Sequence, residues 1–389
     1  MNGICLHNGT VMTSFAAMED CAVLVEDGLI ADVFSEKRFE QKRFGSDVEI
    51  IDVQGAFITP GFIDTHIHGF GGYGTDDCTA DSIVEMSRLL CRYGVTAFNP
   101  TLYPIAGDDM VGAVRQIAAA IGKENGARIL GLHLEGPFIS PNKLGVQKPD
   151  TLRPVDIPFM ERLWEASGGH IANMTVAPEI KGMRELALFC IKKGIVLQAG
   201  HTDANYENMV EGMQAGILHA THLFNAMSKL EHRNPNAVGA VLIHPEMSCE
   251  IIADGFHVHP DVFKLLQRDK PNDKIVLVTD GLKPTEQKEG PFFANGEEVI
   301  FHDGAFHRKI DDVIAGSGLT MIQGIKNLVS FGFSLEDAAK TAAFNPAQVL
   351  RYNHKGALIP GYDADITVFD GDFNIRAVIV GGSIKKNEF

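Results

Sequence analysis

Residues 60–69 read PGFIDTHIHG and place two histidines at the end of an apolar strand pattern. His66 and His68 are two positions apart, so on a strand both side chains point to the same side. Two imidazoles on one side of a strand can share a metal ion. The HxH pattern alone fits two structural histidines equally well, so the sequence around it has to decide.

Outward from this segment, apolar runs alternate with amphipathic helical patterns, which is typical of parallel β/α units. Helical spacing is clearest around Ile83, Met110 and Met183. Eight such units predict an α/β fold built on a (β/α)8 TIM-like barrel. The eight predicted strands are 62–68, 95–99, 129–135, 174–177, 195–199, 219–223, 250–253 and 275–279.

The two chain ends have strand patterns instead. Residues 22–26 and 29–34 flank Asp27-Gly28, a strong hairpin signal, and the last stretch has two further strand patterns separated from the chain end by Gly381-Gly382. We therefore expect one β-sandwich module from residues 1–58 and 353–389, with the barrel over 59–352. Residues 224–248 have no clear helical period, so we predict a long loop there on the active face.

Composition limits the classes of function. The chain has 389 residues, 45% hydrophobic and 22% charged, within the range of soluble globular enzymes. A net charge of -16 argues against a nucleic-acid partner, and no apolar run reaches the roughly 20 residues that span a bilayer. The first residues, MNGICLHNGT, lack a signal-peptide order, and six cysteines lack paired spacing. We expect a cytoplasmic protein with no membrane partner and no disulfides.

Acids and histidines follow four more predicted strands: Glu135, His201, His222 and Asp280. The carboxyl ends of barrel strands form the active face, so these side chains and the HxH pair predict a metal site. Imidazole and carboxylate ligands suit zinc, iron or manganese, and the ion would lower the pKa of a bound water that acts as nucleophile. Asp280 is predicted as general base and then acid. We expect His133, on the same strand as Glu135, to orient ligands rather than to bind metal.

Seven motifs occur in the order PGFIDTHIHG, LHLEGPF, AGHTDA, THLFNAM, IADGFHVHP, VTDG and AGSGLTM. With NPA and KGALIPGYDADITVF near the end of the chain, they resemble the N-acetylglucosamine-6-phosphate deacetylases of the amidohydrolase superfamily. The resemblance runs from about Pro60 to Phe369. It implies removal of the acetyl group from a phosphorylated amino sugar, in amino-sugar catabolism and cell-wall sugar recycling.

The resemblance also implies roles for individual residues. Glu135, His201 and His222 would bind the primary metal, and Asp280 would be the catalytic acid/base. Members that keep His66 and His68 can hold two metals, so one or two divalent ions per subunit are expected. His257 would help to polarise the scissile carbonyl. The implied substrate-binding positions are Asn225, Ala226, His232, Arg233, His257, Ala315, Gly316 and Ser317.

Within that set, Arg233 with His232 beside it matches a phosphate-binding position that reaches across the interface of a homodimer with a shared active site. Lys229 adds a third cationic candidate on the same loop. Related amidohydrolases bridge two metals with a carboxylated lysine on the fourth strand. Here that strand reads NMTVAPE and has no lysine, so Glu135 would have to take its place.

Three alternatives stay open at this stage. The substrate could be another acetamido sugar phosphate of the galactosamine type, or a cyclic amide. The chain could also be a catalytically silent barrel that serves as a scaffold. The complete ligand set together with Asp280 argues against the scaffold, because a silent relative would be free to lose these residues.

Overall fold

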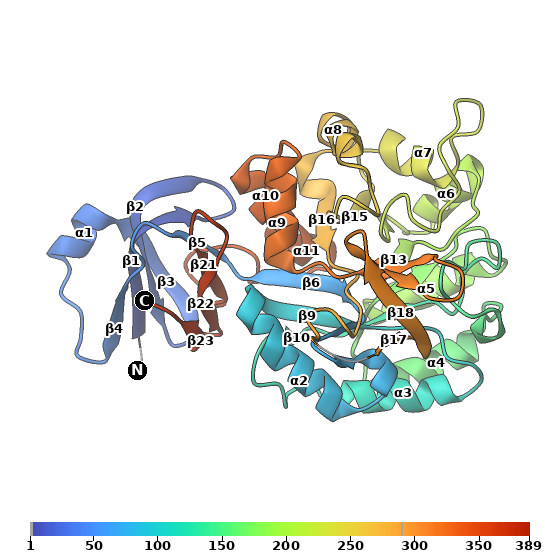
Figure 1. Cartoon of the computed structure of the whole chain (residues 1–389), viewed down its shortest axis with the longest axis horizontal. Coiled ribbons are helices and arrows are strands. Elements are labelled where there is room, and N and C mark those ends of the chain that lie inside the picture. Colours follow the sequence, from blue (N-terminus) through green and yellow to red (C-terminus); the bar gives the residue numbers. More distant parts are fainter. Residues whose placement is uncertain (1–2, 289–290) are drawn as a thin grey trace.

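The computed structural model describes residues 3–288 and 291–389, and it has two parts (Figure 1). The smaller part, on the left of the figure, is a sheet module that contains both chain ends. Its strands lie in the order β23-β22-β21-β5-β1-β2-β3, and β4 pairs with β1. The module strands are β1 (Gly3–Met12), β2 (Ala17–Glu26), β3 (Leu29–Ser35), β4 (Val48–Asp52), β5 (Phe57–Pro60), β21 (Ile366–Phe369), β22 (Ile375–Val380) and β23 (Ser383–Asn387).

The predicted hairpin at Asp27-Gly28 is confirmed, because β2 and β3 pair as antiparallel strands on either side of it. Both turn residues have positive φ, 52° for Asp27 and 80° for Gly28, which is the backbone of a type I′ hairpin turn. A short helix, α1 (Glu36–Gln41), follows β3 where no helix was predicted. None of its residues is buried, so it has no apolar period to detect.

The larger part is the predicted barrel. Its strands pair in parallel in the order β6-β9-β11-β12-β13-β14-β15-β16. Backbone hydrogen bonds from Asp280 N to His66 O (2.9 Å) and from His68 N to Gly281 O (2.9 Å) join its two ends. The barrel strands are β6 (Phe62–Ile67), β9 (Val95–Leu102), β11 (Leu132–Glu135), β12 (Ile171–Val176), β13 (Val196–Ala199), β14 (His219–Ala220), β15 (Ser248–Ile252) and β16 (Ile275–Val278), with β10 (Arg128–Ile129) beside β9.

Helices surround the strands, and their apolar sides face inward. In the first of them, Ile83, Met86 and Leu90 are buried at the spacing that predicted the helix. None of the helices within the described ranges is long and apolar enough to cross a membrane. The barrel helices are α2 (Ala80–Leu90), α3 (Asp109–Ala118), α4 (Ile157–Ala166), α5 (Met183–Lys193), α6 (Tyr206–Gln214), α7 (Asn236–Ile243), α8 (Pro260–Asp269), α9 (Met321–Ser330), α10 (Leu335–Ala342) and α11 (Phe344–Val349).

The prediction of one long loop over 224–248 was wrong, because α7 occupies 236–243. Five consecutive α7 residues, 237–241, are buried, so the apolar pattern has no polar side and no helical period. A second feature absent from the prediction is an antiparallel sheet inserted after β16. Its strands are β17 (Phe292–Ala294), β18 (Glu297–His302), β19 (Ala305–Arg308) and β20 (Ile314–Ser317), and a two-stranded ribbon of β7 (Gly69–Phe70) and β8 (Tyr73–Gly74) follows β6.

Candidate metal centre and active site

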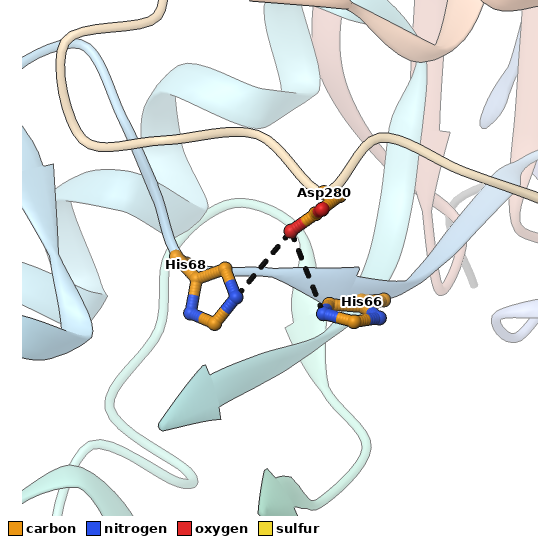
Figure 2. A group of neighbouring side chains, drawn as sticks. All are labelled: His66, His68 and Asp280. Atoms are coloured by element: carbon orange, nitrogen blue, oxygen red, sulfur yellow. Dashed lines mark ion pairs between the residues drawn. The ribbon is translucent and has the colours of Figure 1, made fainter. Parts of the chain in front are cut away.

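The two histidines of the first motif lie at the carboxyl end of β6, close to Asp280 (Figure 2). Nε2 of His66 is 3.5 Å and Nε2 of His68 is 3.4 Å from the same Asp280 oxygen, Oδ1. Asp280 is the second residue after β16 and has a positive φ of 47°. Because the backbone bonds that close the barrel join these same segments, the closure itself brings the three side chains together.

A second group forms on neighbouring strands. Glu135 ends β11, His201 follows β13 and His222 follows β14. Nε2 of each histidine lies 3.1 Å from Oε1 of Glu135, and the two Nε2 atoms are 3.2 Å apart. All three side chains are buried. This is the trio that the family resemblance implied as the primary metal ligands.

Glu135 also faces the first group, so one carboxylate is shared. Its Oε1 lies 3.4 Å from Nε2 of His66, and its Oε2 lies 3.4 Å from Nε2 of His68. Glu135 lies between the two sets of histidines, so its carboxylate would be able to contribute to a cation site on each side. The fourth strand, β12, presents no lysine that could do this.

The donor set fits a divalent cation. Among the described residues, Nε2 of His66 is buried and makes no hydrogen bond, although two carboxylates face it. Such an atom is costly unless a ligand satisfies it. The ligand atoms of each trio lie within 4.8 Å of one another. Nitrogen and carboxylate oxygen donors are those that zinc, iron and manganese accept.

The electrostatics keep the carboxylates ionised. Burial alone would raise the pKa of Glu135, but His201, His222 and His66 outweigh it and hold the pKa well below the usual range. Burial likewise acts to raise the pKa of Asp280, and His66 and His68 lower it below its ordinary value. Both oxygens of the Glu135 carboxylate and both oxygens of the Asp280 carboxylate can therefore act as hydrogen-bond acceptors or metal ligands.

His133 lies inside the barrel and is not part of either group. Its ring meets that of His66 edge-on at 4.6 Å, and its nitrogens lie 3.1 Å from Thr101 Oγ1 and 2.9 Å from Thr175 Oγ1. Burial and the neighbouring His66 hold its pKa well below the ordinary value. This geometry agrees with the expectation that His133 supports a ligand rather than acting as one.

A cavity of about 320 Å³ opens above the two groups, within the size range of small-molecule sites. Of the predicted substrate residues, Asn225, Ala226, His257 and Ala315 line it. The Nδ1 atom of His257 lies 2.6 Å from Asp254 Oδ2. Burial alone would lower the pKa of His257, but the hydrogen bond to Asp254 outweighs it and raises the pKa.

Gly316 and Ser317 support the wall of the cavity rather than lining it. A Cβ at Gly316 would lie 2.6 Å from Leu282 and 3.0 Å from the Asp280 carbonyl, and its φ of 155° favours glycine. Ser317 donates its backbone N–H to the Asp280 carbonyl at 3.0 Å and its hydroxyl to the Thr279 carbonyl. Both residues therefore fix the segment that carries Asp280.

The predicted phosphate-binding residues lie elsewhere. His232 and Arg233 are exposed, as is Lys229, on the segment that precedes α7. They are not among the residues that line the cavity, and within the described chain that lining contains no lysine or arginine. Among residues 3–288 and 291–389, one chain therefore brings no lysine or arginine to the cavity wall.

Sequence reasoning missed three side chains of this site. Gln147 donates its amide N–H to Oε2 of Glu135 at 2.6 Å, and Tyr103 stacks on His68 with ring centroids 3.7 Å apart. Oε2 of Glu250, in β15, lies 2.9 Å from Nδ1 of His66. Only Glu250 carried a signal, a charged residue inside an otherwise apolar strand. Gln147 lies in an irregular loop and had none.

Comparisons with known proteins identify the family. The model of the amidohydrolase family matches residues 57–385. The N-acetylglucosamine-6-phosphate deacetylase of Bacillus subtilis (strain 168) is 33% identical, with 96% of this chain and 95% of the relative covered. An N-acetylgalactosamine-6-phosphate deacetylase of Escherichia coli O157:H7 is 27% identical, with 96% and 97% covered.

Among solved structures, one similar chain is a mutant N-acetyl-D-glucosamine-6-phosphate deacetylase from Mycobacterium smegmatis in complex with N-acetyl-D-glucosamine 6-phosphate. Its TM-score is 0.91 at 26% identity, and both chains are covered completely. The likeness therefore extends over the sheet module as well as the barrel.

Proposed function

This chain belongs to the amidohydrolase family, and we propose that it hydrolyses the acetamide of N-acetyl-D-glucosamine 6-phosphate to D-glucosamine 6-phosphate and acetate. The observation that carries the proposal is Glu135, shared between two ligand groups at the base of a cavity of small-molecule size. The substrate is the one named for the Bacillus subtilis relative, with which this chain shares almost its whole length.

We propose one or two divalent ions per subunit, zinc, iron or manganese. Glu135, His201 and His222 would hold the first, and His66, His68 and Asp280 with the other oxygen of Glu135 would hold a second. When bound, such an ion lowers the pKa of a coordinated water and polarises a nearby carbonyl.

Asp280 moves the proton. Its Oδ1 faces the ligand histidines at the base of the cavity, and its pKa lies below the ordinary range, so it is an ionised base before reaction. It accepts a proton from the attacking water and passes that proton to the amide nitrogen as the C–N bond breaks. The free amine leaves neutral, and the acetic acid formed with it loses its remaining proton to solvent to give acetate.

His257 supports the developing charge on the acetamide oxygen. Asp254 binds its Nδ1 and raises its pKa, which leaves Nε2 as a donor at the cavity wall. A fixed donor of this kind is most valuable where negative charge develops during reaction. Asn225, Ala226 and Ala315 contact the sugar, and Gly316 and Ser317 hold the wall behind it.

The 6-phosphate needs a cation that the cavity wall lacks. We propose that Arg233 of the partner subunit, with His232 and Lys229 beside it, supplies that charge in a homodimer with a shared active site. The exposed position of this segment before α7 leaves it free to reach a second subunit. Charge-assisted hydrogen bonds of this kind are short and strong, which would offset the repulsion from a net charge of -16.

We place the reaction in the cytoplasm. All six cysteines are free in the structure, which suits a reducing compartment. The product class, a phosphorylated hexosamine, is an intermediate of amino-sugar catabolism.

Acetate release tests the activity. Protein loaded with zinc, iron or manganese should release acetate from N-acetylglucosamine 6-phosphate and should lose activity when a chelator removes the metal. The galactosamine epimer is the matched comparison, because one relative carries that specificity in its name. Faster turnover of the galactosamine epimer would replace the proposed substrate, and no release from either sugar would contradict the deacetylase reading.

A further inference from the structure

Glu250 is a fully buried carboxylate in the middle of β15, whose five residues are all buried. A carboxylate in such a place needs partners for both oxygens. Its Oε2 lies 2.9 Å from Nδ1 of His66 and 3.3 Å from the backbone N of His222. Its Oε1 accepts from Gln198 Nε2 at 3.0 Å and lies 3.7 Å from His219 Nε2.

The contact with His66 determines what the other side of that ring can do. An ionised carboxylate only accepts hydrogen bonds, so Nδ1 of His66 carries a proton and donates a hydrogen bond to Glu250. In the neutral ring the opposite nitrogen, Nε2, then has a lone pair. Nε2 is the atom that faces Glu135 and Asp280 and makes no hydrogen bond.

We propose that Glu250 is a positioning residue that holds His66 with Nε2 aimed at the His66, His68, Asp280 group and so sets the affinity of that group for its ion. This inference rests on the proposed two-ion function. Glu250 touches neither substrate nor ion and acts only through the ring of His66. Partners of this type fix the tautomer and orientation of a ligand histidine and raise its basicity.

The other ligand histidines depend less on Glu250. Nδ1 of His201 is held by the carbonyl of Lys143 at 2.9 Å, and His68 is held by stacking on Tyr103. His222 meets Glu250 only through its backbone N–H, at 3.3 Å. A change at Glu250 should therefore weaken the His66 group and spare the Glu135, His201, His222 group.

Glu250→Gln is the first test, because it keeps the size of the side chain and removes the charge. Metal-replete protein is equilibrated with a series of chelator-buffered zinc concentrations, and the zinc retained per chain is measured by elemental analysis. We expect the ion held by the His66 group to bind about tenfold to a hundredfold more weakly, and the ion held by Glu135, His201 and His222 to bind as in the wild type. Excess zinc should restore kcat, and KM should stay near the wild-type value.

His219→Asn is the matched control. His219 lies on the Oε1 side of Glu250, and its Nδ1 contacts Ser248 at 2.8 Å, so its replacement disturbs the same pocket without touching the bond to His66. We expect both ions to bind as in the wild type. If Glu250→Gln does not fold, Glu250→Asp keeps the charge but shortens the reach, and it should weaken the same ion by a smaller factor.

Three results would overturn the proposal: unchanged zinc retention in Glu250→Gln, equal weakening of both ions, or the same loss in His219→Asn. Equal weakening of both ions, or the same loss in His219→Asn, would show that Glu250 only contributes to packing inside the barrel. A wild-type protein that retains a single ion would instead contradict the two-ion form of the proposed function, which allows one or two ions. Glu250 is then judged by whether its variant lowers the affinity of that one ion.

Discussion

At the scale of single residues, Asp280 is the first to test, because its carboxylate faces both histidines of the first motif and the cavity. We expect Asp280→Asn to fold and to keep the ion held by Glu135, His201 and His222. Its kcat should fall by about 10²–10⁴, the usual range for loss of a general acid–base group. Steady-state kinetics with elemental analysis of the same sample checks both parts, and near-normal kcat would move the base to another residue, with His257 next.

The pair of His257 and Asp254 gives a pH prediction. Asp254 raises the pKa of His257 in the folded state. The pair of protonated His257 with Asp254 therefore contributes its full stabilisation below about pH 6.5, the ordinary pKa of histidine. That contribution is lost as the pH rises through the folded-state pKa. Asp254→Asn should therefore reduce the free energy of unfolding more at about pH 6 than at about pH 9.

Urea denaturation at the two pH values measures this difference. Asp261→Asn is the control, because Asp261 is exposed on α8 and its lowered pKa, held down first by Lys264, keeps it ionised throughout that range. A destabilisation by Asp254→Asn that is equal at both pH values would show that the hydrogen bond to a charged His257 adds nothing to stability.

At the scale of elements, the exposed segment before α7 carries the proposed phosphate contact. Loss of a charge-assisted hydrogen bond of about 1.5–3 kcal/mol predicts that Arg233→Ala lowers kcat/KM for the phosphorylated sugar roughly tenfold to a hundredfold. The unphosphorylated sugar should be affected little. Arg184→Ala, an exposed arginine on α5, removes the same charge elsewhere and serves as the control.

The cross-subunit part has its own measurement. Mixing Arg233→Ala with Asp280→Asn under conditions that exchange subunits should restore some activity, because one site of a mixed dimer has both residues intact. Equal losses for phosphorylated and free sugar would refute the phosphate role. A monomer by light scattering with full activity would refute only the shared site.

The elements also mark how far sequence reasoning reaches. Most of the barrel strands were predictable because they are short runs rich in apolar residues, and the candidate ligands were predictable because each stands at or just after the end of a strand. The α7 helix was not, since residues 237–241 are buried consecutively and leave no helical period to detect. Glu250 and His66 are 184 positions apart, and only the closed barrel makes them neighbours.

At the scale of the whole molecule, burial protects the thiols. Burial raises the pKa of Cys5, Cys91, Cys190 and Cys249 to about 12, so almost none of each is thiolate at pH 8. Native protein should react rapidly with Ellman's reagent at no more than one thiol, with Cys78, the half-buried one, the first candidate. All six should react in urea, and two or more fast thiols in native protein would contradict the buried assignment.

The molecule as a whole has the class of fold that the sequence predicted, a parallel barrel with a small sheet module from both chain ends. The residue boundaries of the two units stay a prediction, as do the roles of the site residues. The inserted sheet of β17 to β20 was missed although the sequence signals it: Asn295-Gly296 and Asp303-Gly304 lie between its strands, all four residues have positive φ, and both pairs are hairpin signals of the same kind as Asp27-Gly28.

The pairing of β5 with β21 has a consequence for how the protein is made. Thr59 pairs with Thr367, so the first sixty residues cannot complete their sheet until β21 has been synthesised and has left the ribosome. The barrel, whose strands are all encoded between these two segments, leaves the exit tunnel first. During synthesis the edge of β5 that later receives β21 therefore waits unpaired through the translation of the entire barrel.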